Sequence, residues 1–368
     1  MLLIDNEATA SVLTMPAVVA VLEQAYQDLA AGDAICRPRI DLRFPVGDAR
    51  SVYQWGSMEG GSASSGYFAI RMKSDVLTEV EYGGTRTQEK HCVAPGSFCG
   101  LVFLLSTRTG EPLALLNDGV LQHMRVGADS AIGTKHAARP DARVLGMLGS
   151  GGMARAHLEA LLTVRPLERV QVYSPTRAHR ERYAAEMGER HGLEVVAMDD
   201  PRDAFRGADI VTACTDAAAD VIVGDWLAPG THVTCIGGRL DARTRARLDA
   251  WLRLGTAPAP ATAPSWRPAD EFLAYAARPR DPVWARHSHG RVRRPPQGPG
   301  APRLVFLEDV LAGRDRARTN DAEITYSERG NIQGAQFFAV AGHVYEQCRE
   351  RGLGRELPTS WFLQDIRD

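Results

Sequence analysis

A glycine-rich loop near residue 150 constrains the fold more than any other feature of this sequence. Residues 144–148 (VLGML) predict a buried strand, and residues 153–164 carry apolar side chains at helical spacing. Between them Gly149-Ser150-Gly151-Gly152-Met153-Ala154 fits the pattern GxGxxA. In this pattern the first glycine allows a tight turn, the second admits a pyrophosphate close to the backbone, and the alanine lets the helix pack closely on the strand. These six residues are the predicted dinucleotide-binding loop.

Predicted strands and helices alternate on both sides of this loop. Strands are expected over 144–148, 169–173, 194–198, 209–214 and 232–236, with helices over 153–164 and 178–191. This alternation predicts a parallel sheet with helices on both faces, which is the α/β doubly wound, Rossmann-type fold. Open sheets of this kind bind ligands at the carboxyl ends of their strands. Thr215 after the fourth strand and Gly237 after the fifth are therefore predicted to line the cofactor site.

The residues after the second strand distinguish between nicotinamide cofactors. An acidic side chain at this position binds the free ribose 2′-hydroxyl and repels a 2′-phosphate. Here Tyr173 is followed by Ser174, Thr176 and Arg177, with Arg180 one turn later. Hydroxyl groups and cations suit a dianionic phosphate. We therefore favour NADP(H), with NAD(H) as the alternative.

The segments on either side of this unit predict a second, α+β domain. A helix is expected over 16–31, strands over 41–44, 51–55, 67–73, 100–106 and 112–116, and a long helix over 334–352. Residues 256–302 hold ten of the 21 prolines and show little periodicity, which is typical of an extended excursion. The predicted organisation is a discontinuous domain of residues 1–124 plus 320–368 and an inserted Rossmann domain of residues 125–319 that includes this excursion.

Charge and composition exclude several classes of function. The net charge of −2 provides no basic field to hold nucleic acid or an anionic membrane. No apolar run approaches the ~18 residues that a membrane helix requires, and the early acidic residues do not fit a secretory signal, so a cytoplasmic location is expected. The six cysteines are scattered without the spacing of a zinc site, and we predict no metal centre.

Several motifs together, in this order and spacing, resemble the ornithine cyclodeaminase/mu-crystallin family. They are residues 110–119 (GEPLALLNDG), Arg125 with the small residues after it, 145–161 (LGMLGSGGMARAHLEAL), 208–215 (ADIVTACT) and 226–238 (WLAPGTHVTCIGG). The resemblance implies NAD(P)-dependent chemistry at a carbon that bears nitrogen, converting an amino acid to an imino acid or the reverse. It also implies a homodimer and a first domain that is completed by the C-terminal helix.

The resemblance also implies which residues surround the substrate, a small anionic amino, imino or keto acid. By position these are Arg39, Lys73, Ser97 on the strand that follows, and Arg125 at a helix start. Arg39 and Arg125 are expected to clamp the carboxylate, because a planar guanidinium matches a carboxylate with two hydrogen bonds. Lys73 is expected to act as general acid or electrostatic stabiliser, and Lys73 and Arg125 are the predicted catalytic residues.

One departure from the family pattern concerns the reaction itself. Arg239 follows the Gly-Gly of the fifth strand, where cyclodeaminases carry an aspartate. Arginine cannot accept a proton at physiological pH, so a cyclisation that relies on this carboxylate loses its agent. We predict instead that Arg239 binds a second anionic group of the substrate.

The leading hypothesis is an NADP(H)-dependent oxidoreductase acting on a C=N or CH–NH bond, such as a ketimine reductase or an amino acid dehydrogenase. One alternative is an ornithine or lysine cyclodeaminase-type ammonia lyase that uses NAD catalytically. The other is an NADPH-dependent small-ligand binding protein of the mu-crystallin type.

Overall fold

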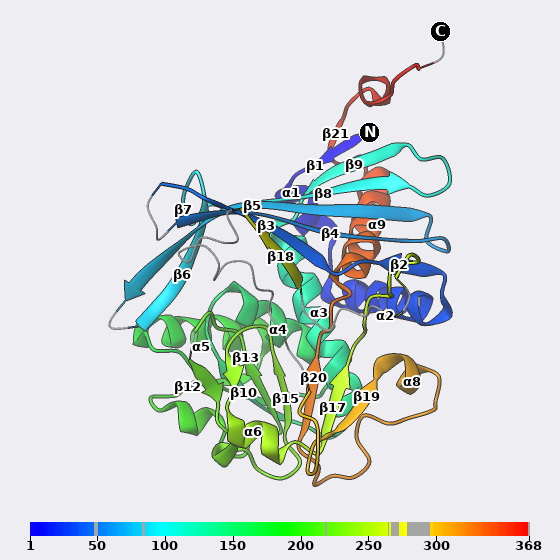
Figure 1. Cartoon of the computed structure of the whole chain (residues 1–368). Coiled ribbons are helices and arrows are strands. Elements are labelled where there is room, and N and C mark those ends of the chain that lie inside the picture. The colour runs from blue at the N-terminus through cyan, green and yellow to red at the C-terminus, as the bar shows by residue number, and fades with distance from the viewer. Residues whose placement is uncertain are drawn as a thin grey trace. The chain divides into compact units, whose positions relative to one another are not determined.

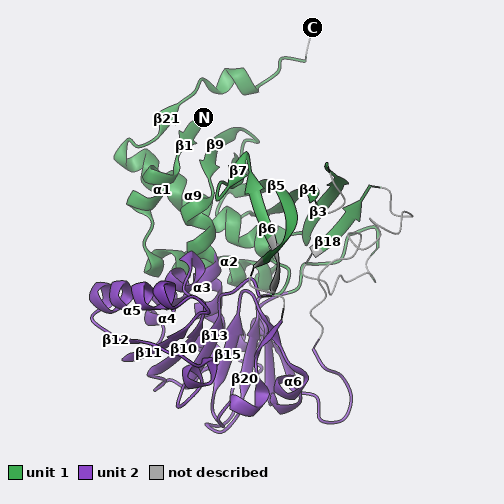
Figure 2. Cartoon of the chain, turned by 90° about the vertical axis from the view of Figure 1, so that its left-hand side faces the viewer, with its two compact units in different colours: residues 1–125, 256–293, 330–368 green, residues 126–255, 294–329 purple. Residues whose placement is uncertain are grey.

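The computed structural model describes residues 1–47, 51–82, 85–217, 219–263, 265, 272–277 and 295–366. The chain divides into two compact units (Figure 2): residues 1–125, 256–293 and 330–368 form unit 1, and residues 126–255 and 294–329 form unit 2. The helix α3 (Gly119–Ala137) crosses the first boundary. The last boundary falls ten residues after the position expected from the sequence, and most of the proline-rich excursion belongs to unit 1 rather than to the Rossmann unit.

Unit 1 contains a mixed sheet with the strand order β18-β3-β4-β5-β8-β9-β1-β21 (Figure 1), with β2, β6 and β7 attached at its side. Most neighbours are antiparallel, while β1 runs parallel to β9 and β18 parallel to β3. The strands are β1 (Leu2–Ile4), β2 (Ala34–Cys36), β3 (Arg39–Pro45), β4 (Ser51–Ser62), β5 (Tyr67–Tyr82), β6 (Thr85–Cys92), β7 (Ala94–Pro95), β8 (Cys99–Ser106), β9 (Pro112–Asn117), β18 (Phe272–Ala276) and β21 (Arg355–Glu356).

Helices cover one face of this sheet, which we call the inner face. The helices are α1 (Asn6–Val12), α2 (Met15–Ala31) and α9 (Gln333–Arg351), followed by the short η4 (Thr359–Phe362). α9 packs on β4 and β5, and α1 and α2 pack on α9. Alternate residues of β5 and β8 are buried on this face, as the period of two in a half-covered strand requires. The residues between them form the outer face, which is half-buried and largely apolar.

Unit 2 contains an eight-stranded parallel sheet with the order β12-β11-β10-β13-β15-β20-β17-β19, and a separate pair, β14 and β16. Its strands are β10 (Val144–Leu148), β11 (Arg169–Tyr173), β12 (Glu194–Ala197), β13 (Ile210–Ala213), β14 (Asp220–Ile222), β15 (His232–Cys235), β16 (Arg239–Leu240), β17 (Ala250–Arg253), β19 (Arg303–Phe306) and β20 (Thr325–Glu328). Its helices are α4 (Gly152–Leu162), α5 (Arg177–His191), η1 (Pro201–Ala204), η2 (Gly224–Trp226), α6 (Ala242–Arg247) and α8 (Leu307–Leu311).

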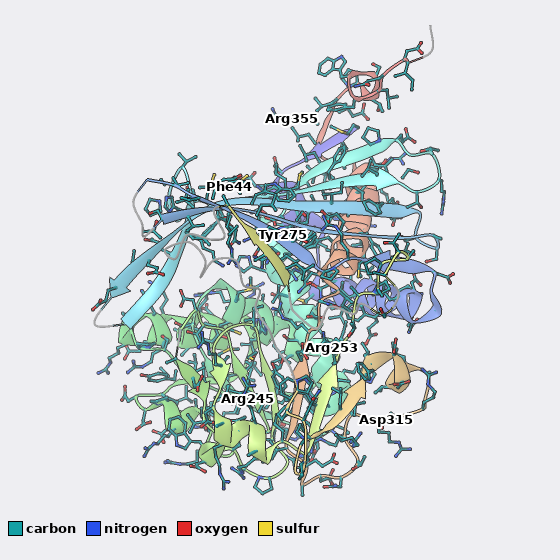
Figure 3. The ribbon with its side chains drawn as sticks, in the orientation of Figure 1. Phe44, Arg245, Arg253, Tyr275, Asp315 and Arg355 are labelled. Atoms are coloured by element: carbon teal, nitrogen blue, oxygen red, sulfur yellow. The ribbon has the colours of Figure 1, made fainter. Side chains whose placement is uncertain are left out.

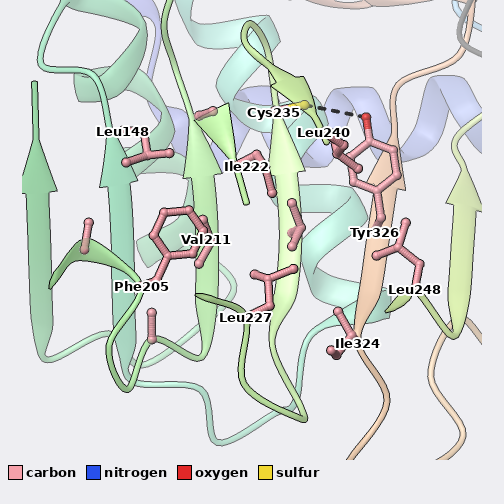
Figure 4. Packing of buried hydrophobic residues seen from close by; sticks show 14 of the residues in the cluster. Leu148, Phe205, Val211, Ile222, Leu227, Cys235, Leu240, Leu248, Ile324 and Tyr326 are labelled. Atoms are coloured by element: carbon pink, nitrogen blue, oxygen red, sulfur yellow. Dashed lines mark hydrogen bonds between the residues drawn. The ribbon is translucent and has the colours of Figure 1, made fainter. Parts of the chain in front are cut away.

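Two apolar clusters lie on opposite faces of the unit 2 sheet. One packs Met147 and Val172 against Leu158 of α4 and Tyr183 of α5. The other, shown in Figure 4, surrounds Phe205 and includes the contact between Cys235 Sγ and the Tyr326 hydroxyl at 3.6 Å. A parallel sheet buried on both faces is the doubly wound architecture that the sequence predicts. The predicted fold class is therefore confirmed.

The excursion contains a strand that the sequence analysis did not predict. β18 pairs with β3 in parallel, with Ala274 opposite Asp41 and Tyr275 opposite Leu42. Figure 3 labels Tyr275 on β18 and Phe44 on β3, both exposed. The rest of the excursion between residues 266 and 294, apart from 272–277, lies outside the described residues.

Two further searches covered only the residues that the structure describes. No single helix there is long and apolar enough to cross a membrane, and α1 and α2 pass that test only as a pair bent by 89°. No group of three or more His, Cys, Asp or Glu side chains in the same residues is arranged to hold a metal ion.

Candidate functional site: a dinucleotide loop and a charged sheet face

The loop between β10 and α4 has the backbone geometry of a nucleotide-binding turn. Gly149 adopts φ +112°, and a Cβ at this position would lie 2.2 Å from the Cys214 carbonyl oxygen. Its N–H donates to the Tyr173 carbonyl oxygen at 2.8 Å, which ties the loop to β11. A Cβ on Gly151, by contrast, would meet no described atom within 4 Å. Gly149 is therefore required by the turn itself, while Gly151 leaves room beside the backbone.

The start of α4 is suited to an anion. The helix begins at Gly152 with Gly151 as its N-cap, so no side chain caps its first N–H groups. Arg155 holds the loop in place by donating from Nη1 to the Ser150 carbonyl oxygen at 2.8 Å. Ala154 is fully buried, as close packing of helix on strand demands. A pyrophosphate fits this cradle, with Gly149 to Ala154 as the residues that would hold it.

The residues after β11 differ in how far their side chains are already engaged. The Ser174 hydroxyl lies 2.9 Å from the Ser150 hydroxyl. Arg180 is buried and donates to the Ser174 carbonyl oxygen at 3.0 Å and to Asp199 Oδ1 at 2.5 Å. Thr176 and Arg177 are exposed at the start of α5, and Arg177 pairs with Glu181 one turn further on. Arg177 is thus the cation at this strand end that faces solvent.

Two other predicted cofactor residues lie side by side at the carboxyl edge of the unit 2 sheet. A Cβ on Gly237 would lie 1.8 Å from the Thr215 carbonyl oxygen, so only glycine allows this approach. The Thr215 hydroxyl accepts a hydrogen bond from the Ala217 N–H at 3.2 Å. Arg239 follows on β16 and is exposed.

In unit 1 the inner face carries charged side chains arranged in rows across three strands. The register pairs Arg43 of β3 with Gln54 of β4, and Gln54 with Asp75 of β5. The next row contains Asp41, Gly56 and Lys73 on the same three strands.

Two arginines lie next to this row on the same face of the sheet. Arg39 stands two residues before Asp41 on β3, and Arg71 stands two residues before Lys73 on β5. The pairing of distant strands therefore gathers residues that are more than 30 positions apart in the sequence.

Lys73 lies among these charges. Its Nζ donates to Asp75 Oδ2 at 3.2 Å, and both side chains are only 7% exposed. On the β3 side, Arg39 binds the fully buried Asp41 with two hydrogen bonds of 2.8 Å. Burial, and after it the Arg39 guanidinium, lower the pKa of Lys73 to about 7, against the opposing attraction of Asp41 and Asp75. Lys73 can therefore gain or lose a proton near neutral pH.

A second group lies on the inner face between β5 and α9. Arg71 is buried and binds Asp118 Oδ2 through Nε at 2.6 Å. Arg125 donates to the side-chain carbonyl oxygens of Gln336 at 2.6 Å and Gln122 at 2.8 Å. Both guanidinium groups lie over the Phe337 ring, at 5.6 Å for Arg71 and 4.9 Å for Arg125. Two cations therefore converge on one aromatic ring.

The structure corrects two of the predicted placements in this unit. Arg125 is the seventh residue of α3, so it does not open a helix; the glycine at position 119 begins it. Ser97 is exposed in the connection between β7 and β8 and is not on a strand. Its N–H and carbonyl oxygen close the local turn, bonding to Ala94 and Cys92. Arg39 acts electrostatically on Lys73, while Arg125 and Arg71 lie against the same ring, that of Phe337.

The sequence analysis missed Arg71 and the acids that accompany these cations. A signal was available, because Arg71, Lys73 and Asp75 alternate on one strand and therefore share a face. Charges at every second position of a strand otherwise indicate a solvated face. In the structure all three side chains are buried, and Phe337 of α9 lies against Arg71.

A Rossmann-type glycine loop in unit 2 and a buried, charged sheet face in unit 1 are therefore the two features that define the class of this chain, an α/β protein with the dinucleotide-binding type of fold. The family model of the ornithine cyclodeaminase/mu-crystallin family matches residues 70–256. The chain belongs to this family.

Individual relatives extend the similarity to most of the chain. A Sinorhizobium fredii protein named an uncharacterized cyclodeaminase is 30% identical, over 90% of this chain and 91% of its own length. A Δ1-pyrroline-2-carboxylate reductase of Bacillus cereus is 28% identical over 70% of this chain and 74% of its own. The structure of the Thermococcus litoralis Δ1-pyrroline-2-carboxylate reductase with NADH and L-proline superposes with a TM-score of 0.72 at 22% identity, covering 97% of this chain and all of that one.

Proposed function

We propose that the protein is an NAD(P)H-dependent reductase of the C=N bond in a small, carboxylate-bearing cyclic imine or ketimine, or, in the reverse direction, an NAD(P)⁺-dependent dehydrogenase of the matching amine. The observation that carries this proposal is Lys73, a buried lysine whose pKa of about 7 lets it hold or release a proton. It lies two residues from Arg71 on the same strand face, and Arg71 shares the Phe337 ring with Arg125. The relationship to the Bacillus cereus reductase supports it further.

The proposed roles follow from the partners of each side chain. The side-chain amides of Gln336 and Gln122 accept hydrogen bonds from Arg125, and these contacts orient its guanidinium. It binds the substrate carboxylate, with Arg71 beside it. Arg39 is engaged by Asp41 and acts mainly on the proton affinity of Lys73. Lys73 delivers the proton to the substrate nitrogen as the carbon is reduced.

For the cofactor we favour NADP(H), with NAD(H) as the alternative. When bound, the nicotinamide supplies the hydride that the substrate carbon receives. The residues of the Gly149–Ala154 loop bind the pyrophosphate, and Thr215 and Gly237 line the adjoining strand ends. The 2′-phosphate meets Ser174, Thr176 and Arg177, since no carboxylate follows β11 directly.

We also propose that two copies associate through the outer face of the unit 1 sheet. This face exposes Phe44 and leaves side chains such as Trp55, Met72 and Phe103 half-buried. Sheet faces this apolar normally lie against another element, and the family resemblance implies a homodimer. Phe103→Glu is expected to yield a monomer in analytical ultracentrifugation, while Leu304→Glu, on an exposed leucine of unit 2, is not. A monomeric parent protein contradicts the proposal.

The reaction is tested by following NADPH and NADH absorbance with Δ1-pyrroline-2-carboxylate and its six-membered homologue. We expect cofactor oxidation that depends on the imine and is faster with NADPH. Ornithine and lysine are offered in parallel, with ammonia measured. Ammonia release without net cofactor change would favour the cyclodeaminase alternative, which Arg239 disfavours. If the protein binds NADPH but turns over no imine or amine, the result would favour the alternative of a small-ligand binding protein.

A further inference from the structure

The row of residues that crosses the inner face at Lys73 alternates between charged side chains and glycines. Asp41 of β3 pairs with Gly56 of β4, Gly56 with Lys73 of β5, and Lys73 with Gly100 of β8. The N–H of Asp118 then donates to the Gly100 carbonyl oxygen at 3.1 Å. The four strands are neighbours in the sheet of Figure 1. Both cross-strand neighbours of Lys73 thus lack a side chain.

Each glycine in this row is covered by a charged neighbour. A Cβ on Gly56 would lie 2.6 Å from Asp41 Oδ1 and 2.6 Å from Lys73 Cε, closer than real Cβ atoms approach other atoms. A Cβ on Gly100 would lie 1.9 Å from Asp118 Oδ1, with no Lys73 atom among its three nearest neighbours. The space above Gly56 is therefore where the Lys73 and Asp41 side chains meet. The space above Gly100 belongs to Asp118 and, through it, to Arg71.

We propose that Gly56 is a positioning residue of the active site, whose missing side chain lets Lys73 lie across β4 beside the Asp41–Arg39 pair. The proposal rests on the proposed function for its catalytic meaning, but the geometry stands without it. With alanine at position 56, either Lys73 or Asp41 must move. Asp41 is fully buried and fixed by two hydrogen bonds to Arg39, with Arg43 3.5 Å away. The longer and more flexible Lys73 side chain is therefore the one displaced.

The displacement has a defined electrostatic consequence. The charged groups that act on Lys73 are Arg39 and Asp41 from β3, Asp75 from β5 itself and Lys90 from β6. Moving the ammonium away from the Asp41–Arg39 pair removes the repulsion of Arg39, which outweighs the attraction of Asp41, while the side chain stays buried. Gly56→Ala is thus expected to raise the pKa of Lys73 toward its ordinary value. Gly100→Ala disturbs Asp118 and Arg71 and serves as the matched control.

The chain has only three lysines, Lys73, Lys90 and Lys135, which makes this measurable directly. Protein labelled with ¹³C at lysine Cε is titrated by NMR, and the Lys73 signal is assigned by its loss in Lys73→Met. The Lys73 midpoint should lie near 7 in the parent, rise by about half a unit or more in Gly56→Ala, and stay nearly unchanged in Gly100→Ala. A Gly56→Ala midpoint that is unchanged or lowered, in protein that still unfolds cooperatively on heating, overturns the proposal.

Activity provides the second reading. Gly56→Ala should lower kcat by about tenfold and move the pH profile, while Gly100→Ala should act mainly on KM. Should Gly56→Ala fail to fold, Arg39→Gln tests the same placement: if Lys73 lies beside the Asp41–Arg39 pair, its midpoint should rise when the guanidinium is removed, and an unchanged midpoint contradicts the proposal. If the parent reduces no imine, the proposed function fails, yet the NMR midpoints still decide the role of Gly56.

Discussion

The two units build their sites from different parts of the polypeptide. In unit 2 the dinucleotide loop is made of backbone: Gly149 adopts the positive φ of the turn, Gly151 leaves space beside the chain, and no side chain caps the first N–H groups of α4. In unit 1 the proposed site is made of side chains, Arg39, Asp41, Arg71 and Lys73, which strand pairing collects from β3 and β5. The geometry of a site made of backbone depends on a few consecutive residues. The geometry of a site made of side chains depends on which residues of neighbouring strands are paired. The loop of unit 2 should therefore tolerate substitutions at most neighbouring positions. In unit 1, a substitution of one charged residue should affect the others.

Replacing Lys73 tests the side-chain site most strongly. Lys73→Met should reduce turnover by about 10²- to 10⁴-fold, because the proton donor is lost while the apolar stem is retained. NADPH affinity, measured by fluorescence, should be unchanged. Lys135→Met, on an exposed lysine of α3, is the control and should keep full turnover. Similar rates for Lys73→Met and the parent would remove Lys73 from the mechanism.

Arg71 tests the coupling within that site. Arg71→Leu leaves the buried Asp118 carboxylate without its partner, which costs about 3–5 kcal/mol of unfolding free energy. The double variant Arg71→Leu/Asp118→Leu should regain most of this stability in urea unfolding. Its KM for the imine should nevertheless stay raised, since the cation is still missing. If the double variant also regains the parent KM, Arg71 is structural only.

Two glycine substitutions in the dinucleotide loop distinguish a glycine that the turn requires from a glycine that leaves space for the cofactor. Gly149→Ala places a side chain at φ +112° against the Cys214 carbonyl oxygen, and should lose roughly 1–3 kcal/mol of stability as well as cofactor binding. Gly151→Ala should unfold at the parent temperature and yet bind NADPH more weakly, because its methyl group occupies the pyrophosphate space. Parent affinity in Gly151→Ala would place the cofactor elsewhere.

The pH profile examines the charge state of Lys73. Since its pKa is lowered to about 7, kcat/KM in the reductive direction should fall about tenfold per pH unit above that value as the ammonium disappears. The titration of Lys73 does not destabilise the fold in this range, so unfolding driven by Lys73 is not the cause of the fall in kcat/KM. The unfolded chain holds the Lys73 proton up to the ordinary pKa of 10.5, so the contribution of this group to stability rises with pH between about 7 and 10.5. A flat profile through this range contradicts the proposed proton transfer.

The smallest expected effect concerns cofactor choice. Arg177→Glu places a carboxylate on the exposed start of α5, and should shift the NADPH-to-NADH preference by about five- to tenfold toward NADH. Arg182→Glu, exposed on the same helix, controls for a general charge effect. Equal shifts in both variants would mean that no 2′-phosphate lies near Arg177.

The difference between the two sites also explains what could be predicted from the sequence. The loop, its flanking strand and helix, and the alternation around them follow from local patterns, and the structure confirms the fold that they predict. The group around Arg71 does not follow from any local pattern, because Asp118 and Phe337 reach it from distant segments. β18 was missed for a related reason: its five residues show no periodicity, and pairing with β3 alone makes them a strand. Ser97 was misplaced because a turn ends just before β8.

The position of α9 in the chain has a consequence for biosynthesis. α9 covers the inner face of β4 and β5, and it begins only at residue 333 of 368. A growing chain therefore carries the unit 1 strands β4 and β5 without α9 until all of unit 2, which ends at Arg329, has been synthesised. Domains generally fold as units in the order in which they emerge. Here the first strands made belong to the last unit completed, and a nascent chain that stops before residue 333 lacks the helix that packs on β4 and β5.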